Sequence, residues 1–109
     1  MSAIQLLIPS KMLGASDDVQ FTASSKTIID SFTATNVSGV AVSITCYLVV
    51  KGDSSKNDNK IIDSKIIDAH ETYVCRELIG SVLDIGDKLN MYAGAASSIS
   101  IRANGRIGI

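Results

Sequence analysis

The sequence has few of the residues that usually carry chemistry. Among 109 residues it has a single histidine, His70, and no tryptophan. One histidine excludes a zinc site built from several histidines, and it leaves a serine-type triad with only one candidate base. Because His70 stands in a polar segment typical of turns, we interpret it as an exposed turn residue. No catalytic residue is predicted, and an enzyme is the least favoured function.

Binding motifs are missing as well. The chain has no glycine-rich phosphate loop and no nucleophile elbow. Acidic residues occur in the segments 53–59 and 84–87, but neither segment has the ligand spacing of a dedicated calcium loop. We therefore expect no metal and no other cofactor. With only three tyrosines and two phenylalanines, an aromatic carbohydrate cleft is not expected either.

Charge and hydropathy also limit the partners. Ten basic and eleven acidic residues give a net charge of -1 without a basic cluster, so no nucleic-acid partner is expected. Hydrophobic residues make up 46%, yet no apolar run approaches the roughly 20 residues of a membrane span. The first residues lack a basic region, and Pro9 interrupts their apolar stretch. No membrane segment and no secretory signal are predicted.

The two cysteines, Cys46 and Cys75, fall on separate predicted strands. We interpret both as buried, small hydrophobic residues. A disulfide between them stays open if the two strands are neighbours. The lack of a signal sequence favours a reducing compartment and argues against that disulfide.

What the chain has in abundance is strand-like alternation. Apolar residues alternate with polar or small ones over Thr27–Asn36 and again over residues 40–50. In the second run one face holds Val40, Val42, Ile44, Cys46 and Leu48. Since only three residues, Val37 to Gly39, join the two runs, we predict a β-hairpin.

A five-residue repeat, Lys-Ile-Ile-Asp at positions 60–63 and again at 65–68, is the most unusual feature. An odd repeat turns its second copy over in a regular strand, which places Ile61 and Ile67 on one face and Ile62 and Ile66 on the other. Either a bulge reverses the strand midway, or a partner covers one apolar face. We take these four isoleucines as the candidate interface.

Several shorter features complete the predicted architecture. A first strand is expected over residues 3–8, ending at Pro9, and a solvated loop over residues 51–60. The pair Asn104-Gly105 is typical of a two-residue hairpin turn. With seven or eight short strands and no helix, the chain is predicted to be an all-β, single-domain antiparallel β-sandwich of jelly-roll type. Residues 27–109 form its body, and residues 1–26 an N-terminal strand and arm able to dock on a neighbour.

The surface suggests assembly. Edge strands pair with other chains unless they are charged or covered, and the predicted strands carry few charges. We therefore expect contacts with copies of the chain, or with a large neighbour, through edge strands and apolar faces.

Residues 27–105 resemble small all-β virion proteins of tailed bacteriophages, which serve as capsid decoration or cement proteins and as tail-associated accessory subunits. The resemblance lies in Thr33-Ala34-Thr35-Asn36, Cys46-Tyr47-Leu48-Val49, Glu71-Thr72-Tyr73, Glu77-Leu78-Ile79-Gly80, Val82-Leu83, Gly86-Asp87, Met91-Tyr92-Ala93-Gly94, Ile99 and Ile101. It implies a structural role in a virion, a homo-oligomer with a trimer favoured, and a major capsid or tail protein as partner. It assigns no functional residue.

Two functions follow as expectations. The first is a non-enzymatic virion protein that decorates or staples the capsid. The second is a tail- or fibre-associated accessory protein, or a module that recognises a host-surface glycan through the polar segments 51–60 and 94–98.

Overall fold

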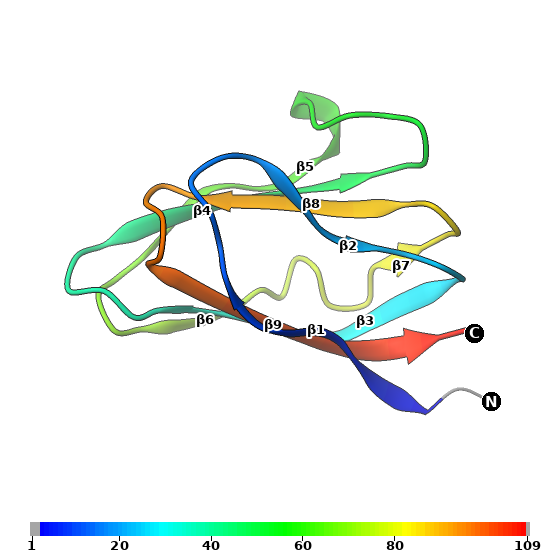
Figure 1. Cartoon of the computed structure of the whole chain (residues 1–109), viewed down its shortest axis with the longest axis horizontal. Coiled ribbons are helices and arrows are strands. Elements are labelled where there is room, and N and C mark those ends of the chain that lie inside the picture. The colour runs from blue at the N-terminus through cyan, green and yellow to red at the C-terminus, as the bar shows by residue number, and fades with distance from the viewer. Residues whose placement is uncertain (1–2, 109) are drawn as a thin grey trace.

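The computed structural model describes residues 3–108 as two antiparallel β-sheets packed face to face (Figure 1). The predicted all-β sandwich is confirmed, with nine strands among the described residues instead of seven or eight. The only helical element described is the short 3-10 helix η1 (Asn57–Asn59), which ends the polar loop before β5.

Each sheet combines strands that are distant in the sequence. The first sheet contains, in order, β1 (Ile4–Met12), β9 (Ile99–Ile107), β3 (Thr27–Asn36) and β6 (Thr72–Val74), with β7 (Val82–Leu83) also pairing with β3. The second sheet contains β2 (Asp18–Thr22), β8 (Lys88–Ala93), β4 (Val42–Val49) and β5 (Lys60–Ile67). Every pairing is antiparallel.

The core lies between the two sheets. Its side chains come from alternate positions of the strands, since every second residue of a strand points to the same side. In β9, for example, Ile99, Ile101 and Ala103 are buried while Arg102 is exposed. The largest fully buried apolar side chains are Phe32, Leu13, Ile29, Ile44, Leu78, Leu83, Leu89, Met91, Ile99, Ile101 and Val49.

The predicted hairpin between the first two alternating runs is wrong. The bounds of β3 are the predicted ones, but β3 pairs with β9 and β4 pairs with β8 and β5. The chain therefore crosses from one sheet to the other between Asn36 and Val42. Val40 lies in this crossing and is exposed, although the alternation placed it on a buried face.

The side chain of Asn36 holds this corner. Its Nδ2 donates to the carbonyl oxygens of Val40 (2.7 Å) and Ile67 (2.9 Å). Its Oδ1 accepts from the backbone N–H of Ser38 (2.9 Å) and from the Ser38 hydroxyl (2.7 Å). Because Asn36 is fully buried, these four hydrogen bonds replace the water that its carboxamide loses.

The predicted Asn104-Gly105 turn is also wrong, because both residues lie inside β9. Gly105 stands opposite Ile29 on one side and Gln5 on the other. A Cβ added at Gly105 would overlap the carbonyl oxygen of Ile28 and would lie 2.6 Å from Leu7 Cδ1. Glycine is required here for close approach between strands, and not for a turn.

The N-terminal residues form a longer first strand than expected, and a second strand as well. β1 continues past Pro9 to Met12, and β2 was not predicted. Pro9 is tolerated because β1 is an edge strand whose register shifts between Ile8 and Lys11. Since β1 pairs with β9 and β2 pairs with β8, residues 3–26 complete one side of both sheets. They are built into the sandwich body, and docking on a neighbour stays a prediction for their outer surface.

We expect Gly105→Ala to lower the free energy of unfolding by at least about 2 kcal/mol, because strand β3 would have to move away. Gly14→Ala is the matched control, since no atom lies within 4 Å of its added Cβ. It should change stability by less than about 1 kcal/mol. Urea unfolding followed by circular dichroism measures both. Equal losses in the two variants would contradict the packing described for Gly105.

Candidate functional site

The four isoleucines of the repeat divide into a buried pair and an exposed pair. Ile62 and Ile67 are 3% and 2% exposed and belong to the core. Ile61 and Ile66 are 38% and 57% exposed. The division that a regular strand would give, with Ile61 and Ile67 on one face, is therefore not the one observed. Only Ile61 and Ile66 are accessible as interface residues.

A β-bulge explains this division and confirms the first of the two predicted alternatives. Ile62 stands opposite Cys46 and Lys65 opposite Ile44, so Asp63 and Ser64 together face the single residue Thr45. Ser64 adopts a φ of 51°, and its N–H donates to Thr45 Oγ1 at 3.1 Å. The extra residue makes an odd spacing behave as an even one. Ile62 and Ile67 therefore both face the core.

Charged side chains protect the free edge of β5. Lys65 Nζ lies 5.0 Å from the centroid of the Tyr73 ring on β6, which belongs to the other sheet. The Tyr73 hydroxyl donates to Glu77 at 2.7 Å. The pKa of Tyr73 is raised to about 12, mainly by burial and to a smaller extent by this hydrogen bond. The arrangement closes the side of the sandwich between β5 and β6, and a lysine at a free edge opposes pairing with another strand.

The other free edges are also unsuited to strand pairing. β1 contains Pro9 and two register shifts, and β2 contains one register shift. β6 and β7 have only three and two residues. Short or irregular edges offer few aligned backbone groups to a second chain. Contacts with other molecules would therefore depend on side chains and loop ends more than on added strands.

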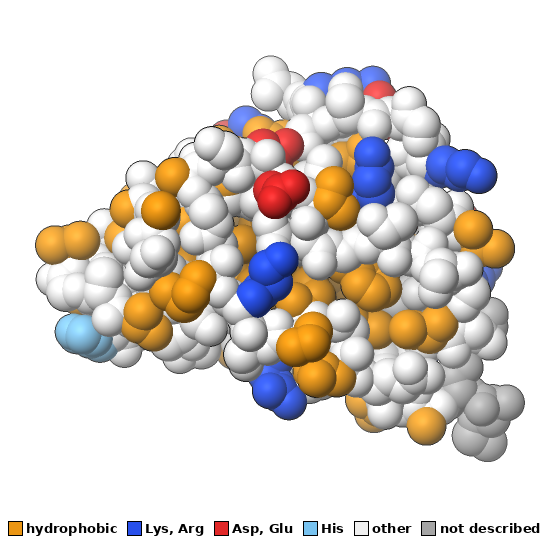
Figure 2. Space-filling model, viewed as in Figure 1, with side chains coloured by type: hydrophobic (Ala, Val, Ile, Leu, Met, Phe, Trp, Pro, Cys, Tyr) orange, Lys and Arg blue, Asp and Glu red, His pale blue; other side chains and the backbone are white. Residues whose placement is uncertain are grey.

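Exposed apolar side chains occur in several places. On the side of the molecule that carries β1 and β2, Figure 2 shows hydrophobic side chains in separate groups, with few charged side chains between them. The large exposed hydrophobic residues of the described chain are Ile4, Leu6, Met12, Val19, Val37, Val40, Val50, Ile61, Ile66, Val74, Ile79, Val82 and Ile85. Apart from Ile61 and Ile66, none was named as an interface residue from the sequence.

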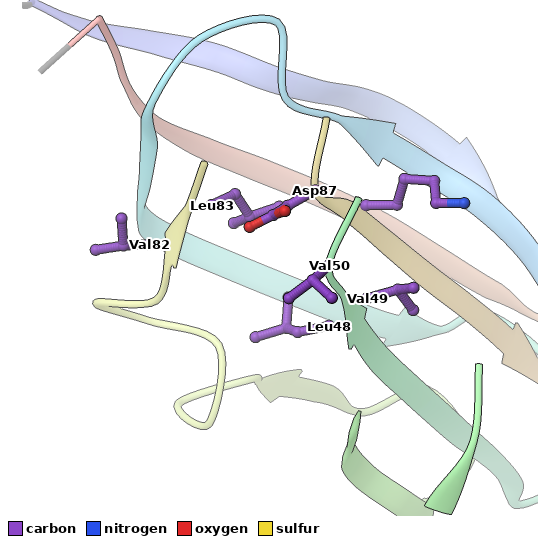
Figure 3. A pocket seen from close by; sticks show the side chains of 7 residues that line it. Leu48, Val49, Val50, Val82, Leu83 and Asp87 are labelled. Atoms are coloured by element: carbon purple, nitrogen blue, oxygen red, sulfur yellow. The ribbon is translucent and has the colours of Figure 1, made fainter. Parts of the chain in front are cut away.

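A shallow pocket lies at one end of the sandwich (Figure 3). It has a volume of about 90 Å³ and is lined by Leu48, Val49, Val50, Val82, Leu83, Asp87 and Lys88. Pockets for small-molecule ligands usually measure roughly 300–1,000 Å³. This pocket is therefore too small for such a ligand. The sequence could not reveal it, because its walls come from β4, β7 and β8.

The Asp87 carboxylate in this pocket serves a conformational role. Its Oδ1 accepts from the backbone N–H of Lys51 at 3.0 Å, and its Oδ2 accepts from the N–H of Asp84 at 2.9 Å. The other acidic loop is similar, since Asp53 forms an ion pair with Lys56 at 3.1 Å. Within residues 3–108, no group of three or more histidine, cysteine or acidic side chains could hold a metal ion.

His70 occupies an exposed position in a turn, as interpreted from the sequence. Its φ of 60° is left-handed, a conformation that histidine adopts more often than most residues do. No catalytic partner for His70 was named from the sequence, and among the described residues no hydrogen bond or salt bridge involves its side chain.

Both cysteines are free thiols and are fully buried, so the question of a disulfide is settled by the structure. Burial raises the pKa of Cys75 to about 12. Burial is also the main reason why the pKa of Cys46 is raised, and the charge that Cys75 would carry when ionised adds to the effect. The reactive thiolate is thereby suppressed at both positions.

We expect neither thiol of the folded protein to react with a disulfide reagent at pH 7, whereas both should react after unfolding in urea. Raising the pH to 9 should accelerate the reaction of the unfolded chain, whose thiols ionise near their ordinary pKa. The folded protein should show little change, because its thiols stay protonated until higher pH. Rapid labelling of the native protein at pH 9 would contradict the burial described.

The repeat provides a second test with internal controls. Ile62→Ala or Ile67→Ala should lower the free energy of unfolding by about 2–5 kcal/mol, because each leaves a cavity in the core. Ile61→Ala or Ile66→Ala should lower it by less than about 1 kcal/mol. Urea denaturation of the four variants gives the comparison. Similar losses in all four would mean that the bulge does not divide them as described.

Comparison of the chain with protein-family models, with curated proteins and with solved structures finds no match. Among the described residues, no helix is long and apolar enough to cross a membrane. The sandwich and its surface are therefore the basis on which a function can be proposed.

Proposed function

We propose that the chain is a non-enzymatic structural protein of a bacteriophage virion, which decorates or staples the capsid through contacts between subunits. The observation that carries the proposal is the exposed pair Ile61 and Ile66 on β5. The bulge places Ile66 on the same outward face as Ile61. Exposed isoleucines on an ordered strand lose water favourably when a partner covers them.

The surroundings of this pair favour a side-chain contact. Lys60, next to Ile61, is turned over the ring of Tyr47, with its Nζ 5.8 Å from the ring centroid. Asp63 forms an ion pair with the same lysine at 3.5 Å. The charges that flank Ile61 thus interact with each other, and they need not find new partners when the surface is covered.

The proposed partner is a major capsid or tail protein, with further copies of the chain as neighbours. The resemblance to phage decoration proteins favours a trimer among the homo-oligomers. In this proposal the protein is made in the host cytoplasm and functions on the particle.

Recognition of a glycan through the two polar segments is less well supported. The segment 51–59 follows the end of β4, and the segment 94–98 follows the end of β8. Because β4 and β8 are antiparallel, the two segments lie at opposite ends of the sandwich. They cannot form a single site for one small sugar.

The test uses particles from cells that carry this gene. We expect an antibody against the protein to label purified particles in electron micrographs at regular positions. Particles that lack the protein should bind the purified protein when it is added back. The double variant Ile61→Ser and Ile66→Ser should bind at least about tenfold more weakly, since it loses two apolar contacts.

The matched control is Ile79→Ser, whose side chain is about as exposed as that of Ile61. It should bind like the unchanged protein. Absence of the protein from purified particles, together with failure to rebind, would refute the proposed function. Normal binding by the double variant would refute the role of Ile61 and Ile66.

A further inference from the structure

Two of the three tyrosines lie close together on the outer face of the second sheet. Tyr47 on β4 stands opposite Asn90 on β8, and Tyr92 is two positions further along β8. Such diagonal neighbours on one face of an antiparallel pair are within reach of aromatic side chains. Because Leu89 and Met91 are buried in the core, Asn90 and Tyr92 point outward. Both tyrosines are partly exposed there.

A carboxylate without a partner lies next to this pair. Asp18, the first residue of β2, stands opposite Met91 on β8. Asp17 precedes it, and in an antiparallel pair it therefore lies alongside Tyr92. Burial raises the pKa of Tyr47, and the nearby Tyr92 and the charge of Asp17 raise it further. Asp17 is exposed, and among the described residues it forms no salt bridge.

Asn90 adds a second acceptor without a partner. Its side chain points outward, yet the residue is only 8% exposed. The loop 51–59 reaches back to it, since Asn90 Nδ2 donates to Ser55 Oγ at 2.9 Å. Within the described chain, Asn90 Oδ1 has no hydrogen-bond partner. In Figure 1 this loop, with η1, projects beyond the second sheet and forms a wall beside the face.

The lysines on this face are engaged away from Tyr92. Lys60 Nζ lies 5.8 Å from the centroid of the Tyr47 ring and 3.5 Å from Asp63 Oδ1. Lys88 lines the pocket at the end of the sandwich. Among the described residues, no cation lies over the Tyr92 ring. The groups that lack a partner are therefore a carboxylate, an amide oxygen and an aromatic face, all of which attract positive charge or hydrogen-bond donors.

We propose that Asp17, Tyr47, Asn90 and Tyr92, which we call the tyrosine cluster, bind a basic side chain, arginine or lysine, that the capsid or tail protein presents. Guanidinium and ammonium groups donate hydrogen bonds to carboxylate and amide oxygens, and they also bind the face of a tyrosine ring. One chemistry thus matches every group of the cluster that lacks a partner. The position of Lys60 over Tyr47 is the same pairing within the chain.

The tyrosine cluster continues the surface that Ile61 and Ile66 provide. Ile66 stands opposite Ser43 on β4, and Ile61 follows Lys60, which stands opposite Tyr47. The two isoleucines therefore border the cluster on its β5 side. Tyrosine and arginine are frequent at the centre of interfaces, where surrounding apolar groups exclude water. This inference deepens the proposed function and rests on it for the identity of the partner.

The purified protein tests the site without particles. The probes are the peptide acetyl-Gly-Arg-Gly-amide, its lysine counterpart and, as a neutral control, acetyl-Gly-Gln-Gly-amide. We expect both basic peptides to shift the NMR signals of Tyr47, Tyr92 and the Asn90 side-chain amide, with a dissociation constant of about 1–30 mM. The glutamine peptide should not shift them. Raising the salt concentration from about 0.1 M to about 1 M should weaken binding at least threefold.

Variants identify the groups that bind. Asp17→Asn should weaken binding of the arginine peptide at least about fivefold, because it loses a charge-assisted hydrogen bond. Asp18→Asn is the matched control, since the Asp18 carboxylate accepts from the Val19 N–H, and it should change binding less than about twofold. Tyr92→Leu should weaken binding, whereas Tyr92→Phe keeps the ring and should bind like the unchanged protein. Circular dichroism should show all four variants folded.

The site would be overturned if neither basic peptide bound, if the glutamine peptide bound equally well, or if Asp17→Asn and Asp18→Asn had equal effects. Unchanged binding by Tyr92→Leu would overturn it too. On particles, Asp17→Asn should rebind at least about threefold more weakly than Asp18→Asn. Equal rebinding would refute this role of the cluster and leave the proposed function standing. Conversely, absence of the protein from particles would refute the proposed function and leave the peptide result standing.

Discussion

The carboxamide of Asn36 holds the corner at which the chain crosses from one sheet to the other. At this residue the chain leaves one sheet and enters the other, and the side chain bonds both to the crossing itself and to the end of β5. Each hydrogen bond contributes only about 1 kcal/mol net, but an unpaired buried amide would cost more. With this corner closed, β3 is free to pair with β9, and β4 with β8. Each of these strands thus pairs with strands that are distant in the sequence.

The sequence predicts local structure better than strand pairing. The bounds of β3 could be read directly, because alternation is a property of neighbouring residues. The hairpin after β3 and the turn at Asn104-Gly105 were wrong for a common reason. Short polar or glycine-containing segments are compatible both with a tight turn and with a corner or a close strand approach. The choice depends on partners such as Ile28 and Ile67, which are remote in sequence.

The candidate interface on β5 could also be predicted only in part, because it too depends on residues remote in the sequence. From the odd spacing of the isoleucine repeat, only two interpretations were left: a bulge, or an apolar face covered by a partner. The bulge depends on a hydrogen bond from the Ser64 N–H to Thr45 on β4, and the repeat itself does not show that acceptor. The pocket between β4, β7 and β8 was beyond prediction, since no local pattern indicates where these three strands leave a recess. The scarcity of candidate catalytic residues, by contrast, is a property of the sequence itself, which contains one histidine.

The bulge at Ser64 also bears on how this chain tolerates change in length. Each core-facing isoleucine of β5 has a second isoleucine beside it in the sequence. Deleting Ser64 would shorten the separation of Ile62 and Ile67 from five positions to four, and regular alternation would then keep both side chains on the core side. Losing the bulge without any deletion would instead turn Ile66 toward the core in place of Ile67. In either case the core receives an isoleucine from this part of β5, so the doubled isoleucines make the strand tolerant of a change at the bulge.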